Sequence, residues 1–287
     1  MDKRIIINAD DFGLCQGVNK AIVTAHTEGI LTSATVMANM PAAQDAVKLA
    51  RKLPKLGTGL HLNLTEGRPI SKDKCVECIL DTEGQFAFSD ERLAWLSLIN
   101  KKIRCAITAE LAAQIQWAID NGLKITHLDS HKHIHSFPVI FSVIIKLTRL
   151  FDIDAVRYTY EPKQLSSKPW PLPSEGGRKR AKLIRVMARI NRFQDSTLFK
   201  TDCLLGVAHT GKIDVNFYKS VALYNSAEIT EIMTHPGFME GLESTGTRLL
   251  RQREIELEAL CSPKTKQYFK DAGIKLVHYG QLQLEKI

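Results

Sequence analysis

Short apolar runs rich in β-branched residues alternate with segments of helical periodicity along almost the whole chain. The expected strands are residues 5–8, 32–37, 59–64, 126–128, 155–159, 203–207, 229–234 and 275–279. Helical patterns lie between them, at residues 17–28, 42–53, 108–121, 137–151 and 248–261. Repeated β-α units of this kind build parallel sheets. The pattern predicts an α/β fold, an irregular (β/α) barrel of seven or eight mostly parallel strands. An open dinucleotide-binding sheet is disfavoured, because no G-x-G-x-x-G or Walker motif follows a strand.

The alternation has no break that would divide the chain into separate domains. Its 287 residues, 44% of them apolar, are enough for one large α/β domain. We therefore expect a single domain over residues 1–287. Residues 66–100 and 161–177 depart from the pattern and are expected to be loops or insertions. Loops after barrel strands build the active-site face, so each is either a substrate wall or a surface excursion.

The N-terminus and the cysteines indicate the cellular compartment. Only three apolar residues, Ile5 to Ile7, follow Met1-Asp2-Lys3-Arg4, which is too short for a signal-peptide core or a membrane span. The six cysteines are scattered, as is typical of reduced intracellular thiols. We expect a cytoplasmic protein. A lone C-x-x-C at Cys75 and Cys78 is a weak candidate for a zinc or redox site, since it has no partner pair.

The formal net charge of +8 is concentrated in the segment from Arg178 to Arg192. Apolar residues recur there at helical spacing, which favours a docked amphipathic helix with a solvated basic face. Contact with an anionic substrate, a membrane or a nucleic acid is the alternative. No nucleic-acid-binding motif accompanies the segment, so no nucleic-acid partner is expected.

The stretch from Thr126 to His135 reads T-H-L-D-S-H-K-H-I-H. Residues two apart on a strand share a face, so Asp129, His131, His133 and His135 are expected to point one way. Each buried imidazole needs partners for two nitrogens, whereas a divalent metal or a catalytic cleft uses them directly. This favours a metal or catalytic role over a solvated histidine cluster.

Two further polar groups follow or interrupt apolar strands. Asp10 and Asp11 come just beyond Ile5 to Ile7, where adjacent carboxylates can divide labour between cation binding and proton transfer. The alternative is that one of them caps the next helix or stabilises the turn. His61 and Asn63 alternate with leucines on the strand at residues 59–64, although a single histidine is more often a core residue.

His235 and Arg157 complete the candidate residues. His235 precedes a Pro-Gly turn at the end of the strand 229–234, and a histidine held there can act as a general acid or base near neutral pH. Arg157 could orient a carboxylate, or it could form a simple surface ion pair. An aspartate and two histidines from three strands would make a metal site with open positions, as hydrolytic metals require.

These motifs together resemble the YdjC-like carbohydrate deacetylases, a family that includes chitooligosaccharide deacetylases and a hopanoid-biosynthesis-associated branch. The matching segments are residues 5–14 (IIINADDFGL), 59–62 (GLHL), 126–135 (THLDSHKHIH) and 235–237 (HPG). The resemblance implies a fold related to the polysaccharide deacetylases. It also implies removal of acetyl groups from N-acetylated amino sugars or oligosaccharides, which gives acetate and a free amine.

The resemblance also assigns roles to single residues. It implies metal ligation by Asp11, His61 and His131, a general base at Asp10, an acid at His235 and, by analogy, an Arg157 that keeps Asp10 ionised. One divalent ion is expected. The imidazoles favour zinc, cobalt or nickel, whereas members of the family are commonly assigned magnesium, so Mg²⁺ and Zn²⁺ both stay open. A homodimer is implied by the resemblance alone.

Two other functions remain open from the sequence. The same residues would suit another metal-dependent amidohydrolase or deaminase that acts on a small non-sugar substrate. A sugar- or metal-binding protein without turnover is the second alternative.

Overall fold

The core of the structure is a seven-stranded parallel sheet. The computed structural model describes residues 3–163, 170–194 and 197–284. Its strands run in the order β4-β3-β2-β1-β6-β5, and β7 also pairs with β1. The bounds are β1 Arg4–Phe12, β2 Ser33–Val36, β3 Gly57–Leu62, β4 Leu128–Ser130, β5 Cys203–Leu205, β6 Ile229–Thr234 and β7 Lys275–Val277. β7 pairs with the first residues of β1 and β2 with the later ones, so one edge of β1 serves two strands.

A segment without regular strand structure links the two ends of this sheet. Val156 bridges Leu128 in β4, and Ala155 bridges Phe199 just before β5. The backbone N–H of Leu204 in β5 donates to the carbonyl of Tyr160 over 2.9 Å. The segment therefore fills the gap between β4 and β5, and the sheet curls into the irregular barrel that the sequence predicted. The prediction of a regular strand at residues 155–159 is wrong, because only isolated bridges form there.

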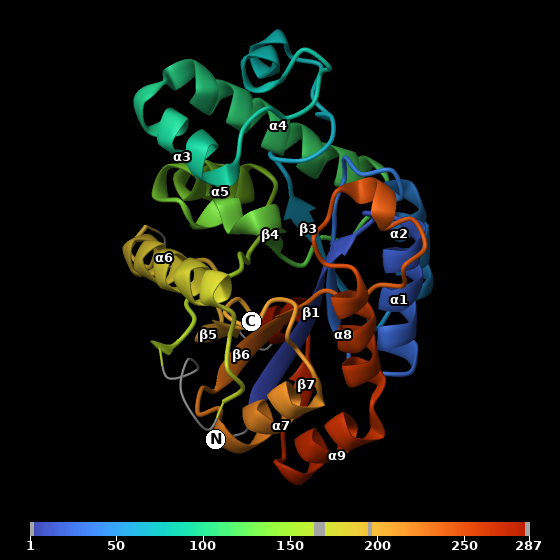
Figure 1. Ribbon diagram of the computed structural model, residues 1–287. Helices are drawn as coiled ribbons and strands as arrows, with labels where there is room; N and C mark the ends of the chain where they lie inside the picture. The colour runs from blue at the N-terminus through green and yellow to red at the C-terminus, as the bar shows by residue number, and fades with distance from the viewer. Residues whose placement is uncertain (1–2, 164–169, 195–196, 285–287) are drawn as a thin grey trace.

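Helices cover the outer face of the barrel (Figure 1). In that view α3, α4 and α5 gather at one end, α7 and α9 lie at the other, and α1, α2 and α8 form one flank. The bounds are α1 Gln16–Thr27, α2 Ala43–Lys52, α3 Asp90–Ile99, α4 Lys101–Asp120, α5 Pro138–Leu150, α6 Glu175–Asn191, α7 Val215–Tyr224, α8 Arg251–Cys261, α9 Pro263–Asp271 and α10 Tyr279–Leu284, with short 3-10 helices η1 Lys74–Ile79, η2 His131–Ser136 and η4 Glu243–Thr245.

Local sequence explains most of these elements. Ile5, Ile6 and Ile7 are fully buried, as expected for a strand covered on both faces. α2 buries Ala43, Ala46, Val47 and Ala50, which are spaced as one face of a helix. Ser89, Ser174 and Asp214 each accept a backbone N–H as the N-cap of α3, α6 and α7.

Both expected loops contain helices. Residues 66–100 hold η1 and α3, and α4 begins at Lys101, well before the helix expected from residue 108. α3 escapes a pattern-based prediction because its apolar residues do not lie on one face, and Trp95, Leu98 and Ile99 stay exposed. α6 begins inside the expected loop 161–177, part of which, residues 164–169, lies outside the described residues.

The basic segment forms α6, a helix docked on the barrel as the sequence predicted. Ala181, Ile184, Ala188 and Asn191 are buried, and the Asn191 side-chain amide donates to the carbonyl of Ser136 over 2.8 Å. Most of its basic side chains lie on the outer face. Among the helices of the described residues, none is long and apolar enough to cross a membrane.

Candidate active site

Asp10 and Asp11 sit at an irregularity in β1. Successive side chains of a regular strand point to opposite faces, which would separate two adjacent carboxylates. Here the register with β2 shifts between Ala9 and Phe12, and Asp11 has a left-handed backbone with φ of 67°. A bulge of this kind re-aims a side chain. Both carboxylates consequently line one pocket and are almost fully buried. Neither caps the following helix, whose N-cap is Cys15.

Asp11, His61 and His131 come together at the carboxyl ends of β1, β3 and β4. Oδ1 of Asp11 lies 3.2 Å from Nδ1 of His131 and 3.5 Å from Nε2 of His61. Each residue offers one ligand atom, and these atoms all lie within 4.8 Å of one another. Two ligands that each bind a tetrahedral ion at about 2.0–2.1 Å are about 3.3 Å apart. The donor atoms therefore have the chemistry and the spacing to hold one divalent ion.

Each of the two imidazoles has a carboxylate on its far side. Nδ1 of His61 lies 2.8 Å from Oδ1 of Asp129, and Nε2 of His131 lies 3.1 Å from Oε1 of Glu66. Histidines that bind metals commonly direct their second nitrogen to such a group, which fixes the ring. Burial alone would lower the pKa of His61, but Asp129 raises it. Burial also opposes protonation of His131, yet Asp11 and Glu66 raise its pKa to about 9. An ion would displace these protons.

Asn63 does not join His61 in the cluster, although the two residues alternate with leucines in the sequence. Its Oδ1 accepts the backbone N–H groups of Thr65 and Glu66, and its Nδ2 donates to the carbonyl of Glu66 over 2.7 Å. Asn63 thus folds the loop after β3 and places Glu66 beside His131. Glu66 was missed from the sequence, because nothing in its spacing marks it.

Arg157 is fully buried among three carboxylates. Its Nη1 and Nη2 donate to the two oxygens of Asp10 over 2.8 and 2.7 Å, and Nη1 also lies 2.8 Å from Oδ2 of Asp129. Nε donates to Oε1 of Glu231, which accepts the Tyr279 hydroxyl at its other oxygen. Burial would raise the pKa of Asp10, but the Arg157 guanidinium holds it well below its usual range. Asp10 is therefore ionised at neutral pH.

Replacing Arg157 by methionine should strongly destabilise the fold. The change leaves Asp10, Asp129 and Glu231 buried without their cation, and breaking a buried ion pair from one side costs about 3–5 kcal/mol of the free energy of unfolding. Urea unfolding at pH 7 measures the loss. Arg178→Met on exposed α6 is the control, with an expected change within about 0.5 kcal/mol. An Arg157 variant as stable as the wild type would contradict this interpretation.

His235 lines the same pocket directly after β6. Burial lowers its pKa to about 4, although the charges of Asp11 and Asp10 act in the opposite direction. α8 lies behind it. A Cβ at Gly237 would approach Cδ of Arg253 to 2.9 Å, so the Pro-Gly turn allows α8 to pack closely. Nη2 of Arg253 donates to Oδ2 of Asp11 over 2.5 Å, which leaves Oδ1 of Asp11 for the histidine cluster.

The histidine-rich segment does not continue as a strand. β4 ends at Ser130, and η2 follows with left-handed backbones at Lys132 and His133, with φ of 53° and 52°. The prediction that Asp129, His131, His133 and His135 share one face is therefore wrong. His131 reaches Asp11 and His133 lines the pocket. Nδ1 of His135 instead lies 2.5 Å from the Ser130 hydroxyl.

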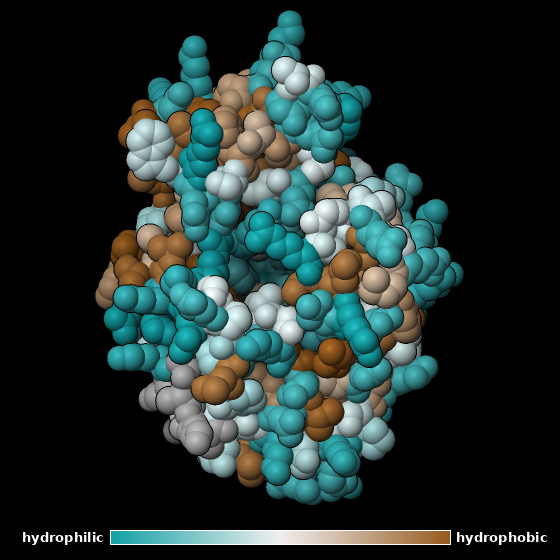
Figure 2. Space-filling model, in the orientation of Figure 1, coloured by the Kyte–Doolittle hydropathy of each residue, from teal (hydrophilic) through white to brown (hydrophobic). Residues whose placement is uncertain are grey.

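Asp10, Asp11, His61, His131 and His235 line a pocket of about 300 Å³. In the orientation of Figure 1, the space-filling view shows a hollow lined by hydrophilic residues near the centre of the molecule (Figure 2). Asp90 and Arg180 form part of its wall and pair with each other across the N-terminal ends of α3 and α6. Arg180 belongs to the basic segment for which an anionic substrate was the alternative partner. Asp90 and Arg253 were not predicted, because Asp90 lies in an expected loop and Arg253 in a helix that resembles an ordinary surface element.

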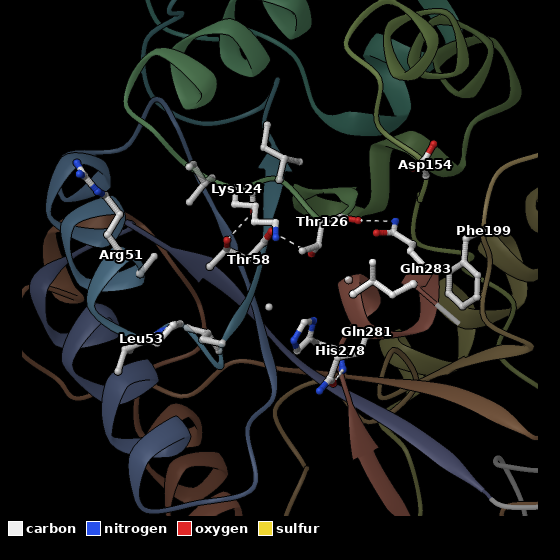
Figure 3. A pocket seen from close by; sticks show the side chains of 18 of the residues that line it. Arg51, Leu53, Thr58, Lys124, Thr126, Asp154, Phe199, His278, Gln281 and Gln283 are labelled. Carbon is white, nitrogen blue, oxygen red and sulfur yellow. Dashed lines mark hydrogen bonds between the residues drawn. The ribbon is translucent and has the colours of Figure 1, made fainter. Parts of the chain in front are cut away.

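A larger cavity of about 820 Å³ lies at the opposite end of the barrel (Figure 3). Its lining comes from residues that precede β3, β4 and β5 and from the C-terminal segment, including Thr58, Lys124, Phe199 and His278. Among the described residues, neither its aspartate, Asp154, nor His278 belongs to a group that could hold an ion. Size alone therefore does not identify the site of chemistry.

Cys75 and Cys78 lie on η1, away from the pocket. All six cysteines are free thiols, and among the described residues neither Cys75 nor Cys78 belongs to a group of side chains that could hold an ion. Burial and the neighbouring Asp73 raise the pKa of Cys75 to about 12, so its thiolate is disfavoured.

The fold and the pocket define a (β/α) barrel protein with an aspartate-histidine cluster at the carboxyl ends of its strands. The sequence model of the YdjC-like protein family matches residues 4–271, so the chain belongs to that family, and the resemblance seen in its motifs is confirmed.

Similar proteins agree with this assignment. A carbohydrate deacetylase of Brevibacillus brevis is 35% identical over 97% of this chain and 99% of its own length. One of Geobacillus stearothermophilus is 32% identical over 98% of each chain. A crystal structure from Enterococcus faecalis V583, provisionally named a cellobiose-phosphate cleavage protein, superposes with a TM-score of 0.75 at 25% identity and covers 98% of this chain and 99% of that one.

Proposed function

We propose that this protein is a metal-dependent hydrolase that removes acetyl groups from N-acetylated amino sugars or oligosaccharides, giving acetate and a free amine. One observation carries the proposal: an Asp-His-His cluster and an ionised carboxylate held by arginine lie in a single cleft. The family membership and the relatives named carbohydrate deacetylases support the choice of substrate.

Asp11, His61 and His131 would hold the ion, Mg²⁺ or Zn²⁺. Two imidazoles favour zinc, whereas magnesium prefers oxygen ligands. Such an ion, when bound, supplies Lewis-acid polarisation of the acetyl carbonyl.

Asp10 is the proposed general base. Because both its oxygens accept from Arg157, the carboxylate is fixed in orientation and stays ionised, ready to take a proton from the attacking water. His235 is the proposed acid, which gives a proton to the departing amine nitrogen. Burial works against the protonated ring, so carboxylates around His235 are needed to favour it.

The test is acetate release from N-acetylglucosamine and its β-1,4-linked oligomers. We expect turnover by the purified protein, its loss after a chelator removes divalent ions, and its return when Mg²⁺ or Zn²⁺ is added alone. Small non-sugar amides serve as the comparison substrates. Faster release from those amides would favour the general amidohydrolase, and saturable sugar binding without acetate would favour the binding protein.

A single catalytic domain, a cytoplasmic location and a homodimer complete the proposal. The exposed Trp95, Leu98 and Ile99 of α3 offer an apolar surface for a second copy. Sedimentation equilibrium of the purified chain measures the oligomeric state.

A further inference from the structure

α8 carries two buried charged residues: Arg253 lines the cleft, and Glu256 accepts from the backbone of His235, which also lines it. They are three residues apart and therefore lie on one face of the helix, and both side chains are almost fully buried. Arg253 pairs with Asp11. Glu256 lies under His235, whose backbone N–H donates to Oε2 of Glu256 over 2.6 Å. The proposed mechanism uses Asp10 as the base and His235 as the acid, and it assigns no role to Glu256.

The ring of His235 also approaches Glu256. Its Nδ1 lies 4.0 Å from Oε2, and Nδ1 is buried without a hydrogen-bond partner among the described residues. Oε1 of Glu256, Nη1 of Arg253 and the Tyr218 hydroxyl are buried without one in the same way. Unpaired buried polar atoms are costly. Among the carboxylates of the described residues, Glu256 is the one that lies within 4.0 Å of Nδ1, so a hydrogen bond between them requires the ring to turn towards Oε2.

We infer that Glu256 is the positioning residue of His235. The carboxylate holds the backbone of His235 through its N–H and accepts from Nδ1–H of the ring, which leaves Nε2 as the nitrogen that can face the cleft. The charges of Asp11 and Asp10 favour the protonated ring, against burial and the positive charges of Arg253 and His61. This inference rests on the proposed function for its catalytic consequence, because the proton donated to the amine would come from Nε2.

The first test compares Glu256→Gln with Glu258→Gln, an exposed position on the same helix. Burial raises the pKa of Glu256 to about 7, so its carboxylate is partly ionised at neutral pH. Glutamine keeps an acceptor oxygen for the His235 backbone but removes that charge. Since a general acid contributes roughly 10²- to 10⁴-fold, we expect Glu256→Gln to lower kcat by about 10- to 100-fold with KM little changed. Glu258→Gln should leave both unchanged. If Glu256→Gln lowers the thermal stability along with kcat, and conditions that stabilise the fold restore kcat, then Glu256 has a purely structural role and the inference fails.

A double mutant separates the two roles. If Glu256 acts through His235, Glu256→Gln should cost less than about twofold in the background of His235→Gln, because residues that act as a unit are not additive. The full 10- to 100-fold loss in that background would overturn the inference.

A second measurement does not need turnover. The ¹⁵N resonances of the His235 ring, assigned with His235→Gln, report which nitrogen carries the proton. We expect Nδ1–H in the wild type at pH 7 and a shift towards Nε2–H in Glu256→Gln. Identical spectra would refute the positioning role. If the wild type releases no acetate, the proposed function fails while this spectrum still decides the role of Glu256.

Discussion

His131→Ala and His61→Ala should each lose divalent-ion binding and acetate release together. Both imidazoles face Oδ1 of Asp11, and a three-ligand protein site cannot keep an ion tightly after one donor is removed. The loss of affinity should exceed the roughly 10- to 100-fold that follows removal of an outer partner of a ligand. Calorimetric titration with Zn²⁺ and Mg²⁺ measures the affinity, and metal analysis after dialysis measures the occupancy.

His133→Gln is the matched control, since His133 lines the pocket but does not belong to the cluster. It should keep the ion. In the wild type, His131 with a pKa near 9 is protonated at pH 7, so ion binding should release a proton and tighten as the pH rises towards 9. Full occupancy with normal rates in either alanine variant would refute the ligand assignment.

Asp10→Asn should keep the ion and lower kcat by roughly 10²- to 10⁴-fold, the contribution typical of a lost general base. The two oxygens of Asp10 are bound by Arg157, whereas Oδ1 of Asp11 faces both histidines. Asp11→Asn should therefore lose the ion as well as turnover. Metal content and kcat of the two variants, measured side by side, give the answer.

The opposite result is equally informative. If Asp10→Asn strips the ion while Asp11→Asn retains it, the two carboxylates have been assigned the wrong way round. If both variants turn over at the wild-type rate, the proposed mechanism fails.

The sequence alone predicts the parts of the site that follow strands. Asp10, Asp11 and His235 follow apolar, β-branched runs and His61 lies on the strand predicted at residues 59–64, and parallel strands bring their carboxyl ends to one face. Their convergence is thus a consequence of topology. The barrel follows from the same alternation.

Other parts depend on contacts that no local pattern records. The left-handed backbones of Lys132 and His133 end β4 early, and such a conformation is uncommon for any residue other than glycine. Glu66 reaches His131 only because Asn63 folds its loop. Arg253 and Glu256 are hidden in α8, which looks like a surface helix until Asp11 and His235 are placed against it.

The Asp11–Arg253 ion pair joins residues 242 positions apart in the chain. Contacts between distant parts of a chain form late in folding, so this pair forms when both ends of the barrel have met. The cluster of Asp11, His61 and His131 lies within the first 131 residues, but the cationic partner of Asp11, Arg253, comes from α8 near the other end of the chain. An emerging chain would therefore present the three residues of the cluster before Arg253 is there to hold Asp11, and a ligand that binds the finished barrel alone would add to the stability of the mature fold.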